Sequence, residues 1–313
     1  MATKRDLLSL ADLGADLPRL LERSHELKLA RARGERVDLL AGRSVALIFE
    51  KPSTRTRVSF EVAVHDLGGH PIYLSPRDTQ LGRGETIGDT ARVLSRYVDA
   101  IVYRAFHSED ERELARHASV PVINALDDRE HPCQVVADLL TLWERWSGEF
   151  AGRRLAFIGD GDNVCHSLLL GAAMVGLNLT VASPAGYRPR DEVFQQAQSI
   201  AGRTGAEIRV VQKPSVAATG ADALYTDVWV SMGDEDQKEA RERAFQGYQI
   251  NAELLALAKP DAWVLHDLPA RRGFEITDEV MDGPRAAIWD QAENRLHAQK
   301  AILELLVRPP PRN

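Results

Sequence analysis

Short apolar runs alternate with amphipathic helical patterns along most of this chain of 313 residues. Segments between the runs, such as 191–205 and 251–259, carry apolar residues three and four positions apart, which indicates helices with one buried face. Alternating strands and helices indicate parallel sheets covered by helices. The pattern therefore predicts an α/β fold with two doubly wound parallel-sheet domains. The predicted strands are 43–49, 71–75, 100–104, 121–126, 154–160, 179–184, 207–212, 223–230 and 262–269.

The boundary between the two predicted domains falls within HPCQVVADLLTLWERWSGEFAGRR, residues 131–154. Its amphipathic part, Val135–Trp146, predicts one helix, and SGEFAGRR then leads back into the strand pattern. We expect a first domain over 1–134, a linking helix within 135–149 and a second domain over 150–290. A final helix over 293–307 is expected to pack back onto the first domain and complete it. Two interdomain helices would then join the domains.

Charge and composition exclude several classes of protein. The formal net charge of −7 argues against a nucleic-acid-binding protein. The longest apolar run, Leu168–Leu177, is about half of the roughly 20 residues that a membrane helix needs, so we expect no membrane association. The N-terminal segment does not resemble a signal peptide. Cys133 and Cys165 are too few for a disulfide framework, and we expect a cytoplasmic protein.

The segment FEKPSTRTRVSFE, residues 49–61, concentrates hydroxyl and basic side chains in a single turn. It follows a predicted strand and opens a predicted helix, with Ser53 in the position of an N-cap. Unpaired N–H groups and the positive end of the helix dipole favour a phosphate there, and Arg55 adds a guanidinium that matches phosphate geometry. The same residues could also form a capped helix with solvated basic side chains. The segment lacks the G-x-x-x-x-G-K pattern of a Walker loop.

Five further polar segments each lie at or just after the end of a predicted strand. Because ligands bind at the carboxyl ends of strands in open α/β sheets, convergence of these segments would form a site. They are VYRAFH with Arg104, HPCQ with His131 and Gln134, GDGDN with Asn163, TDVWVSMG (226–233) and HDLPARRG (266–273).

Taken together, FEKPSTRTRVSFE, HPCQVVADLLT, TDVWVSMG, LPARRG and AENRLHAQKA resemble the signature segments of the aspartate/ornithine carbamoyltransferase family, and most closely its ornithine branch. The resemblance runs in order over nearly the whole chain. It implies transfer of the carbamoyl group from carbamoyl phosphate to the δ-amine of L-ornithine, which gives L-citrulline and phosphate, in arginine metabolism. It also implies that the first domain binds carbamoyl phosphate and the second binds ornithine.

The resemblance assigns roles to individual residues of this chain. Gln80 matches a residue that the family donates to a neighbouring subunit, which implies a homotrimer with shared sites. Asp227 and Ser231, with Asn163 and the backbone of Met232, match contacts to the head of ornithine. The implied contacts to carbamoyl phosphate are Ser53, Thr54, Arg55, Thr56, Gln80, Arg104, His131, Gln134, Asp267, Leu268 and Arg295.

The chemistry of the implied reaction explains why these residue types are needed. A neutral amine attacks a carbonyl carbon, and charge builds on the carbonyl oxygen and on the departing phosphate. Fixed donors aimed at those atoms stabilise the transition state more than the ground state. Because carbamoyl phosphate arrives activated, we expect no covalent nucleophile, no cofactor and no metal. The residues expected to act in catalysis are Arg55, Thr56, Arg104, His131 and Asp267.

Asp267 stands where the ornithine branch usually has a cysteine, and Arg271 stands where it usually has a histidine. A carboxylate near the attacking amine would favour the ammonium form, which cannot attack. It could instead accept the proton as a general base, or mark a different cationic acceptor. Turnover and acceptor choice are therefore open at this point.

Alternative functions remain. One is a sister carbamoyltransferase that acts on lysine, an acylated ornithine or putrescine, although DVWVSMG argues against putrescine because that amine has no α-amino acid head. Another is a non-catalytic relative, which the joint presence of Arg55, Arg104, His131 and Arg295 disfavours. GDGDN begins like a dinucleotide fingerprint, but its third glycine is replaced by Val164. The sequence leaves open whether the reaction is biosynthetic or catabolic, and whether trimers assemble further.

Overall fold

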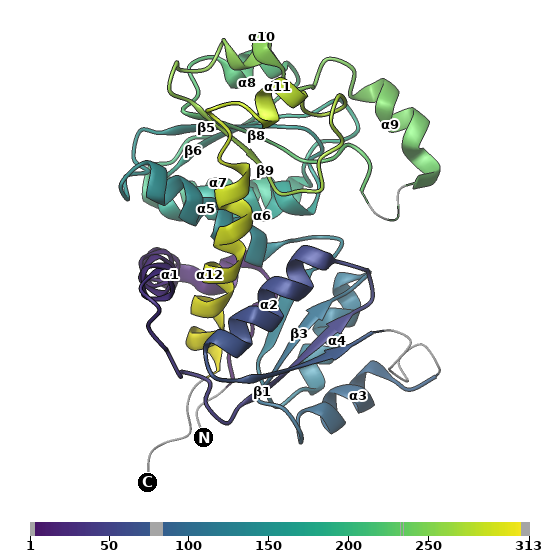
Figure 1. Cartoon of the computed structure of the whole chain (residues 1–313). Helices are drawn as coiled ribbons and strands as arrows, with labels where there is room; N and C mark the ends of the chain where they lie inside the picture. Colours follow the sequence, from purple (N-terminus) through teal and green to yellow (C-terminus); the bar gives the residue numbers. More distant parts are fainter. Residues whose placement is uncertain (1–3, 76–83, 232, 234, 308–313) are drawn as a thin grey trace. The chain divides into compact units, whose positions relative to one another are not determined.

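The computed structural model describes residues 4–75, 84–231, 233 and 235–307, which form two compact units (Figure 1). The first unit comprises Met1–Leu140 and Glu293–Asn313, and the second comprises Thr141–Ala292. Both points of division fall inside helices, namely α5 (Pro132–Arg145) and α12 (Ile288–Leu306). The first unit is therefore built from two stretches of chain that are far apart in sequence.

The sheet of the first unit has four parallel strands in the order β2-β1-β3-β4. The strands are β1 (Ser44–Phe49), β2 (His70–Leu74), β3 (Ala100–Arg104) and β4 (Val122–Leu126). All of β3 and nearly all of β1 are buried, as expected for strands that are covered on both faces. The N–H of Leu7 donates a hydrogen bond of 2.9 Å to the carbonyl of Val122, so the N-terminal segment covers the open edge of β4.

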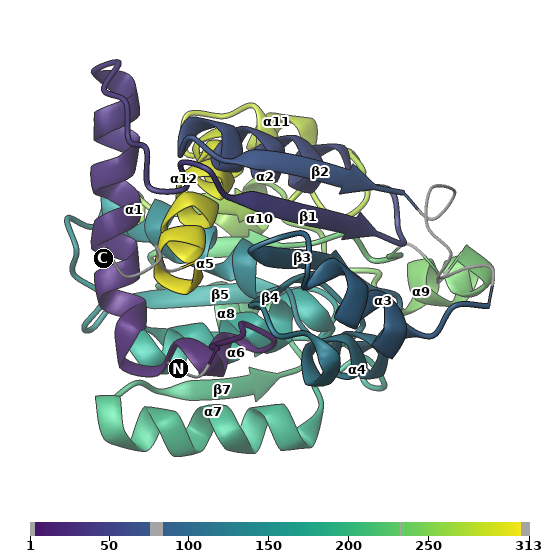
Figure 2. The ribbon, with the colours of Figure 1, turned by 90° about the horizontal axis from the view of Figure 1, so that it is seen from below.

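Helices cover this sheet. In Figure 2, α2 (Thr54–Asp66) lies along β1 and β2. α4 (Ser108–His117) contributes Leu114 to a core with Ile48 and Ile101. η1 (Leu10–Asp16) begins with a capping box, in which the Ser9 side chain accepts from the backbone and Asp12 accepts from the N–H of Ser9. The other helices that lie within this unit are α1 (Leu17–Ala32) and α3 (Ile87–Leu94).

The sheet of the second unit has five parallel strands in the order β7-β6-β5-β8-β9. Its strands are β5 (Arg154–Ile158), β6 (Asn178–Ala182), β7 (Ile208–Val211), β8 (Ala223–Thr226) and β9 (Trp263–His266). The order of connection reverses between β5 and β8, as it does between β1 and β3 in the first unit. Such switch points are where open α/β sheets bind ligands, at the carboxyl ends of the strands.

The helices of the second unit follow their strands. They are α6 (Asn163–Val175), α7 (Asp191–Thr204), α8 (Pro214–Ala218), η3 (Glu235–Gln237), α9 (Lys238–Ala244), α10 (Ala252–Leu255) and α11 (Asp278–Met281). Between β5 and α6, position 161 requires glycine, because a Cβ at this position would lie 2.1 Å from the backbone nitrogen of Pro189. The second glycine of GDGDN therefore serves chain packing in this turn.

The predicted fold is confirmed: two parallel-sheet α/β units are present, and a strand overlaps each of the nine predicted segments. Several bounds differ. α5 begins at Pro132 because proline is tolerated in the first turn of a helix. α12 begins at Ile288 and not at 293. The helix expected over 251–259 is shorter in the structure, where α10 ends at Leu255. Among the helices of the described ranges, none is long and apolar enough to span a membrane.

Candidate active site

The turn between β1 and α2 has the geometry of an anion site. Ser53 has extended backbone angles, and its Oγ accepts a hydrogen bond of 3.4 Å from the N–H of Thr56, which confirms the predicted N-cap. The first N–H groups of α2 have no partner within the helix, and the helix dipole makes this end positive. Thr56 is buried, whereas Thr54 and Arg55 are exposed. A phosphate at this helix end would contact the backbone N–H groups and also the guanidinium of Arg55.

Arg295 connects α12 to this turn. Its Nη2 donates a hydrogen bond of 3.0 Å to Oγ1 of Thr56, and its Nη1 donates to Oε1 of Gln134. The amide of Gln134 is fixed in turn, because its Nε2 donates to Asp138 over 2.8 Å. Arg295, Gln134 and Thr56 are 4%, 1% and 2% exposed. The contacts to Thr56 and Gln134 are to neutral oxygens, so they orient the guanidinium without cancelling its charge.

Arg104 and His131 belong to the same region of the first unit. Arg104 is the last residue of β3, and His131 directly precedes α5; both are buried. Burial lowers the pKa of His131 well below its ordinary range, and the nearby guanidinium groups of Arg295 and Arg104 lower it further. The imidazole is therefore neutral near pH 7. A neutral imidazole can donate one hydrogen bond to a ligand oxygen without giving up its proton.

In the second unit, polar residues gather at the end of β5. Asn163 is the first residue of α6, and its Oδ1 accepts a hydrogen bond of 2.7 Å from the N–H of Val164. Asp160 forms an ion pair with Arg241 of α9, and both side chains are nearly buried. The guanidinium of Arg241 also lies 5.1 Å from the ring centre of Tyr187. Asp160 therefore attaches α9 to this strand end, and sequence reasoning did not anticipate its partner Arg241.

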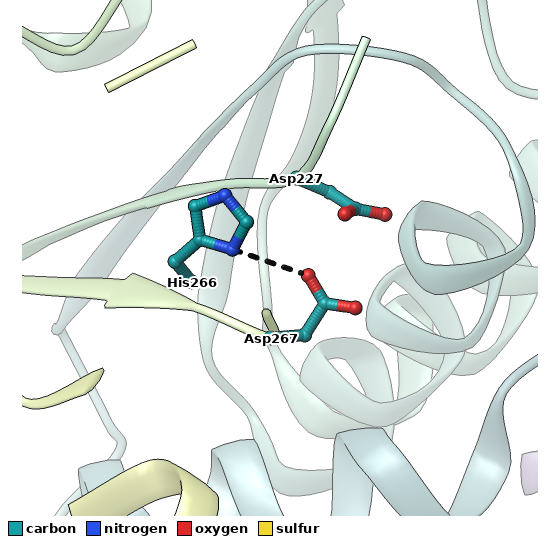
Figure 3. Close-up of side chains that lie close together, drawn as sticks. All are labelled: Asp227, His266 and Asp267. Atoms are coloured by element: carbon teal, nitrogen blue, oxygen red, sulfur yellow. Dashed lines mark ion pairs between the residues drawn. The ribbon is translucent and has the colours of Figure 1, made fainter. Parts of the chain in front are cut away.

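The ends of β8 and β9 bring Asp227, His266 and Asp267 together (Figure 3). Each offers one nitrogen or oxygen atom, and these atoms all lie within 4.8 Å of one another. Nδ1 of His266 and Oδ1 of Asp267 are 3.6 Å apart. Oδ1 of Asp227 accepts a hydrogen bond of 2.6 Å from the N–H of Val228. Burial raises the pKa of Asp227 above its ordinary value.

Hydrogen bonds fix the tautomer of His266. Its Nδ1 accepts a hydrogen bond of 2.9 Å from the N–H of Leu268, so this nitrogen carries no proton. Nε2 therefore carries the proton and donates to Glu275 over 3.1 Å. Both ring nitrogens are engaged by these two contacts, and a metal ion at Nδ1 would have to displace the bond from Leu268. The cluster is better described as a hydrogen-bonded group than as a metal centre. Sequence reasoning missed the roles of His266 and Glu275.

The remaining predicted residues are placed as follows. Leu268 has a positive φ of 61°, the Leu268–Pro269 peptide bond is cis, and the Leu268 side chain packs against the core of the second unit. Because its N–H donates to His266, its carbonyl is the backbone group that could meet a ligand. Ser231 is partly buried after Val230. Gln80 and Met232 lie outside the described residues.

Comparison with known families covers nearly the whole chain. The model described as the carbamoyl-P binding domain of aspartate/ornithine carbamoyltransferase matches residues 5–144, and the model described as its Asp/Orn binding domain matches residues 151–306. The chain belongs to the aspartate/ornithine carbamoyltransferase family. Thr56 and Gln134 lie in the first matched range. Their partner Arg295 lies in the second matched range, because α12 supplies it.

Individual family members are similar over their full length. Proteins named ornithine carbamoyltransferase from Gloeobacter violaceus and Methanoculleus marisnigri are 58% and 54% identical, over 96% and 97% of this chain and 95% and 97% of theirs. The solved structure of the ornithine carbamoyltransferase from Pyrococcus furiosus is similar with a TM-score of 0.94 and 49% identity, and the match covers 97% of each chain. The family prediction made from the sequence is thus confirmed.

Proposed function

We propose that this protein is an ornithine carbamoyltransferase, which transfers the carbamoyl group from carbamoyl phosphate to the δ-amine of L-ornithine and yields L-citrulline and phosphate. The observation that carries the proposal is the buried hydrogen bond from Arg295 to Thr56, which holds a guanidinium at the N-terminus of α2. Relatives with this name match the chain at 50–58% identity over nearly its full length. We place the reaction in arginine metabolism.

Carbamoyl phosphate binds to the first domain in this proposal. That domain comprises residues 1–134 and is completed by 293–307, while 135–149 forms the linking helix. The phosphate occupies the N-terminus of α2, where Ser53, Thr54, Arg55 and Thr56 supply N–H and hydroxyl donors. Arg104 and Arg295 add positive charge. Because negative charge on the phosphate grows as the C–O bond breaks, these groups stabilise the transition state more than the bound substrate.

The carbonyl oxygen of the carbamoyl group accepts hydrogen bonds from Thr56, Arg104 and His131. His131 is suited to this role because its lowered pKa keeps it neutral, so it polarises the carbonyl without transferring a proton. Gln134, which is held by Asp138 and Arg295, bonds to the carbamoyl amide. The departing phosphate accepts the proton of the attacking amine, so the chain needs no covalent nucleophile, metal or cofactor.

Ornithine binds to the second domain, residues 150–290. The carboxylate of Asp227 pairs with the α-ammonium, together with Ser231, and Asn163 donates to the α-carboxylate. The backbones of Met232 and Leu268 add carbonyl and amide groups. The side chain of Asp267 lies beside Asp227, and its backbone faces the carbamoyl group and the attacking amine.

Assembly and location are part of the same proposal. The protein forms a homotrimer in the cytoplasm, and Gln80 of each subunit completes the site of its neighbour. Its ligands are carbamoyl phosphate and L-ornithine, with no nucleic acid or membrane partner.

The test is a citrulline assay with carbamoyl phosphate and a panel of acceptors: L-ornithine, L-lysine, N-acetylornithine and putrescine. We expect ornithine to be the best acceptor. Thr56→Val preserves side-chain shape and removes one donor, so the rate should fall about 100-fold. Thr219→Val, on an exposed turn of the second unit, is the matched control and should leave the rate unchanged. A preference for another amine would overturn the assigned acceptor, and absence of carbamoyl transfer to all four would overturn the enzymatic function.

A further inference from the structure

One buried carboxyl group holds both flanks of the turn that follows β9. Oε1 of Glu275 accepts a hydrogen bond of 3.1 Å from Nε2 of His266, the last residue of the strand. The same oxygen accepts a hydrogen bond from the backbone N–H of Arg271. Glu275 is fully buried and His266 is 1% exposed. Residues 267–270 therefore form a turn whose two flanks are joined at a single atom.

His266 constrains the backbone inside this turn. Its own N–H donates over 2.9 Å to Oε1 of Gln291, which is also buried. Its Nδ1 accepts a hydrogen bond of 2.9 Å from the N–H of Leu268, two residues later. Leu268 has a φ of 61°, a conformation that is unfavourable for a bulky residue and persists only where the surroundings enforce it. The imidazole supplies part of that constraint.

The backbone of Leu268 has two polar groups, its N–H and its carbonyl. The N–H donates to His266, so the carbonyl is the group that could meet a ligand. A carbonyl accepts hydrogen bonds and cannot donate them, so its partner must be a donor. In the dianion of carbamoyl phosphate, only the NH2 group can donate. Acetyl phosphate has nearly the same shape, but a methyl group replaces the NH2. The direction of this carbonyl can therefore distinguish the two compounds.

We propose that His266 and Glu275 are positioning residues that fix the direction of the Leu268 carbonyl, and that this carbonyl contributes to a preference for carbamoyl phosphate over acetyl phosphate. The inference rests on the proposed function, and on the place of Leu268 among the contacts to carbamoyl phosphate that the family resemblance implies. His266 acts through the N–H of Leu268, and Glu275 acts through the ring of His266. Neither side chain needs to touch the substrate.

A fixed acceptor favours the ligand that has the matching N–H group. An analogue without that N–H leaves the acceptor desolvated and without a partner, so the analogue binds more weakly. One hydrogen bond between neutral groups contributes up to about 10-fold to such a preference. If the Leu268 carbonyl is no longer held, this share of the preference is lost. The phosphate group is bound by the first domain in the proposed function, so its binding should remain.

The experiment compares the two acyl phosphates on the whole protein. KM for carbamoyl phosphate is measured at saturating ornithine, with acetyl phosphate and inorganic phosphate as competitive inhibitors. The ratio of Ki for acetyl phosphate to KM for carbamoyl phosphate gives the preference, and Ki for inorganic phosphate reports on the anion turn. Where turnover is too slow, calorimetry with L-norvaline, which has no δ-amine to react, gives the corresponding dissociation constants.

Three variants and a control separate the contributions. His266→Leu removes the acceptor for the N–H of Leu268, so the preference should fall about 10-fold. His266→Asn should regain most of it, because an asparagine oxygen can accept from the N–H two residues on. Glu275→Met removes the acceptor for the imidazole and should also lower the preference. Glu279→Met, the same change at an exposed position of α11, should leave it unchanged. Ki for inorganic phosphate should be the same in all four variants.

The outcomes are distinct from those for the proposed function. If the unchanged protein makes citrulline and His266→Leu keeps the full preference, the inference is wrong while the function stands. Equal losses in His266→Leu and His266→Asn would also overturn it, because the bond to Leu268 would not be the cause.

A parallel rise in Ki for inorganic phosphate would mean that these residues support the fold as a whole, which contradicts a positioning role. If His266→Leu does not fold, Glu275→Met decides in the same way. If the unchanged protein forms no citrulline from ornithine, the proposed function fails and this inference fails with it.

Discussion

Arg295 of α12 reaches Thr56 of α2 across 239 positions of sequence and donates to its hydroxyl over 3.0 Å. Its second terminal nitrogen donates to Gln134, so the guanidinium is held at two points. The planar guanidinium holds its N–H donors in fixed directions and also carries a charge. Lysine cannot reproduce this geometry.

Arg295→Lys should therefore weaken carbamoyl phosphate binding although the positive charge remains. Hydrogen bonds to charged groups are worth about 1.5–3 kcal/mol, and we expect a loss of affinity in that range. Calorimetric titration with carbamoyl phosphate measures it. Arg23→Lys, on a partly exposed side chain of α1, is the control and should bind as before. Unchanged affinity in Arg295→Lys would show that only net charge matters at this position.

Shared sites can be tested by mixing chains. Arg55→Ala should remove a guanidinium from the anion turn, and Gln80→Ala should remove the residue proposed to serve the neighbouring subunit. Each variant alone should be nearly inactive. Trimers that contain both chains should regain activity, because some sites then combine an intact Arg55 from one chain with an intact Gln80 from another. Activity of co-expressed, separately tagged chains is the measurement, and no recovery in verified mixed trimers would exclude the shared site.

The ion pair of Asp160 with Arg241 should be important for stability. The two side chains are 11% and 10% exposed, so removal of one partner leaves a largely buried charge. Arg241→Met should lower the free energy of unfolding by about 3–5 kcal/mol. Replacing both residues, as Asp160→Asn with Arg241→Met, should cost less than the sum of the single changes. Denaturant unfolding of the four proteins gives the coupling, and strict additivity would mean that the pair does not interact.

Because of Glu111 in α4, the free energy of unfolding should decrease as pH rises. Burial raises its pKa well above the ordinary value, and the negative charge of Asp127 raises it further. The folded protein therefore keeps a proton on Glu111 at pH values where the unfolded chain has lost it. Its contribution to stability is largest below the unfolded pKa of about 4.3 and decreases by up to about 1.4 kcal/mol per pH unit above it.

The check is urea unfolding of Glu111→Gln from about pH 5 to about pH 8. The amide cannot ionise, so the variant should gain stability relative to the unchanged protein as pH increases. Glu109→Gln, at an exposed position of the same helix, should follow the unchanged protein. If the curves for Glu111→Gln and the unchanged protein run parallel, Glu111 is not protonated in the fold.

The sequence was sufficient to predict those features that depend on local pattern. Strands such as β1 and β3 are uninterrupted apolar runs because both faces are covered. The N-cap at Ser53 was predictable because its hydroxyl and the helix that follows are neighbours in the chain. Bounds were less predictable: Val228, Trp229 and Val230 continue the apolar pattern, but β8 ends at Thr226, where its pairing with β9 stops.

Contacts between distant residues could not be predicted from pattern. The sequence marks Asp267 as unusual, but nothing in it states that the carboxyl lies beside Asp227. The hydrogen bonds of His266 involve Leu268 and Glu275, which only the folded chain brings to its two nitrogens. In the sequence, Arg241 is one of several charged residues in DEDQKEARER. Only the folded chain shows that it forms an ion pair with Asp160.

The discontinuous first unit has a consequence for biosynthesis. The N-terminal end leaves the ribosome first, yet this unit needs Glu293 and the residues after it, which are translated after all of the second unit. The unit translated in the middle is therefore the first whose whole chain is available for folding. A polypeptide that is truncated before Arg295 would carry the complete anion turn without the guanidinium that orients it. Translation must therefore pass Arg295 before the hydrogen bonds that join it to Thr56 and Gln134 can form.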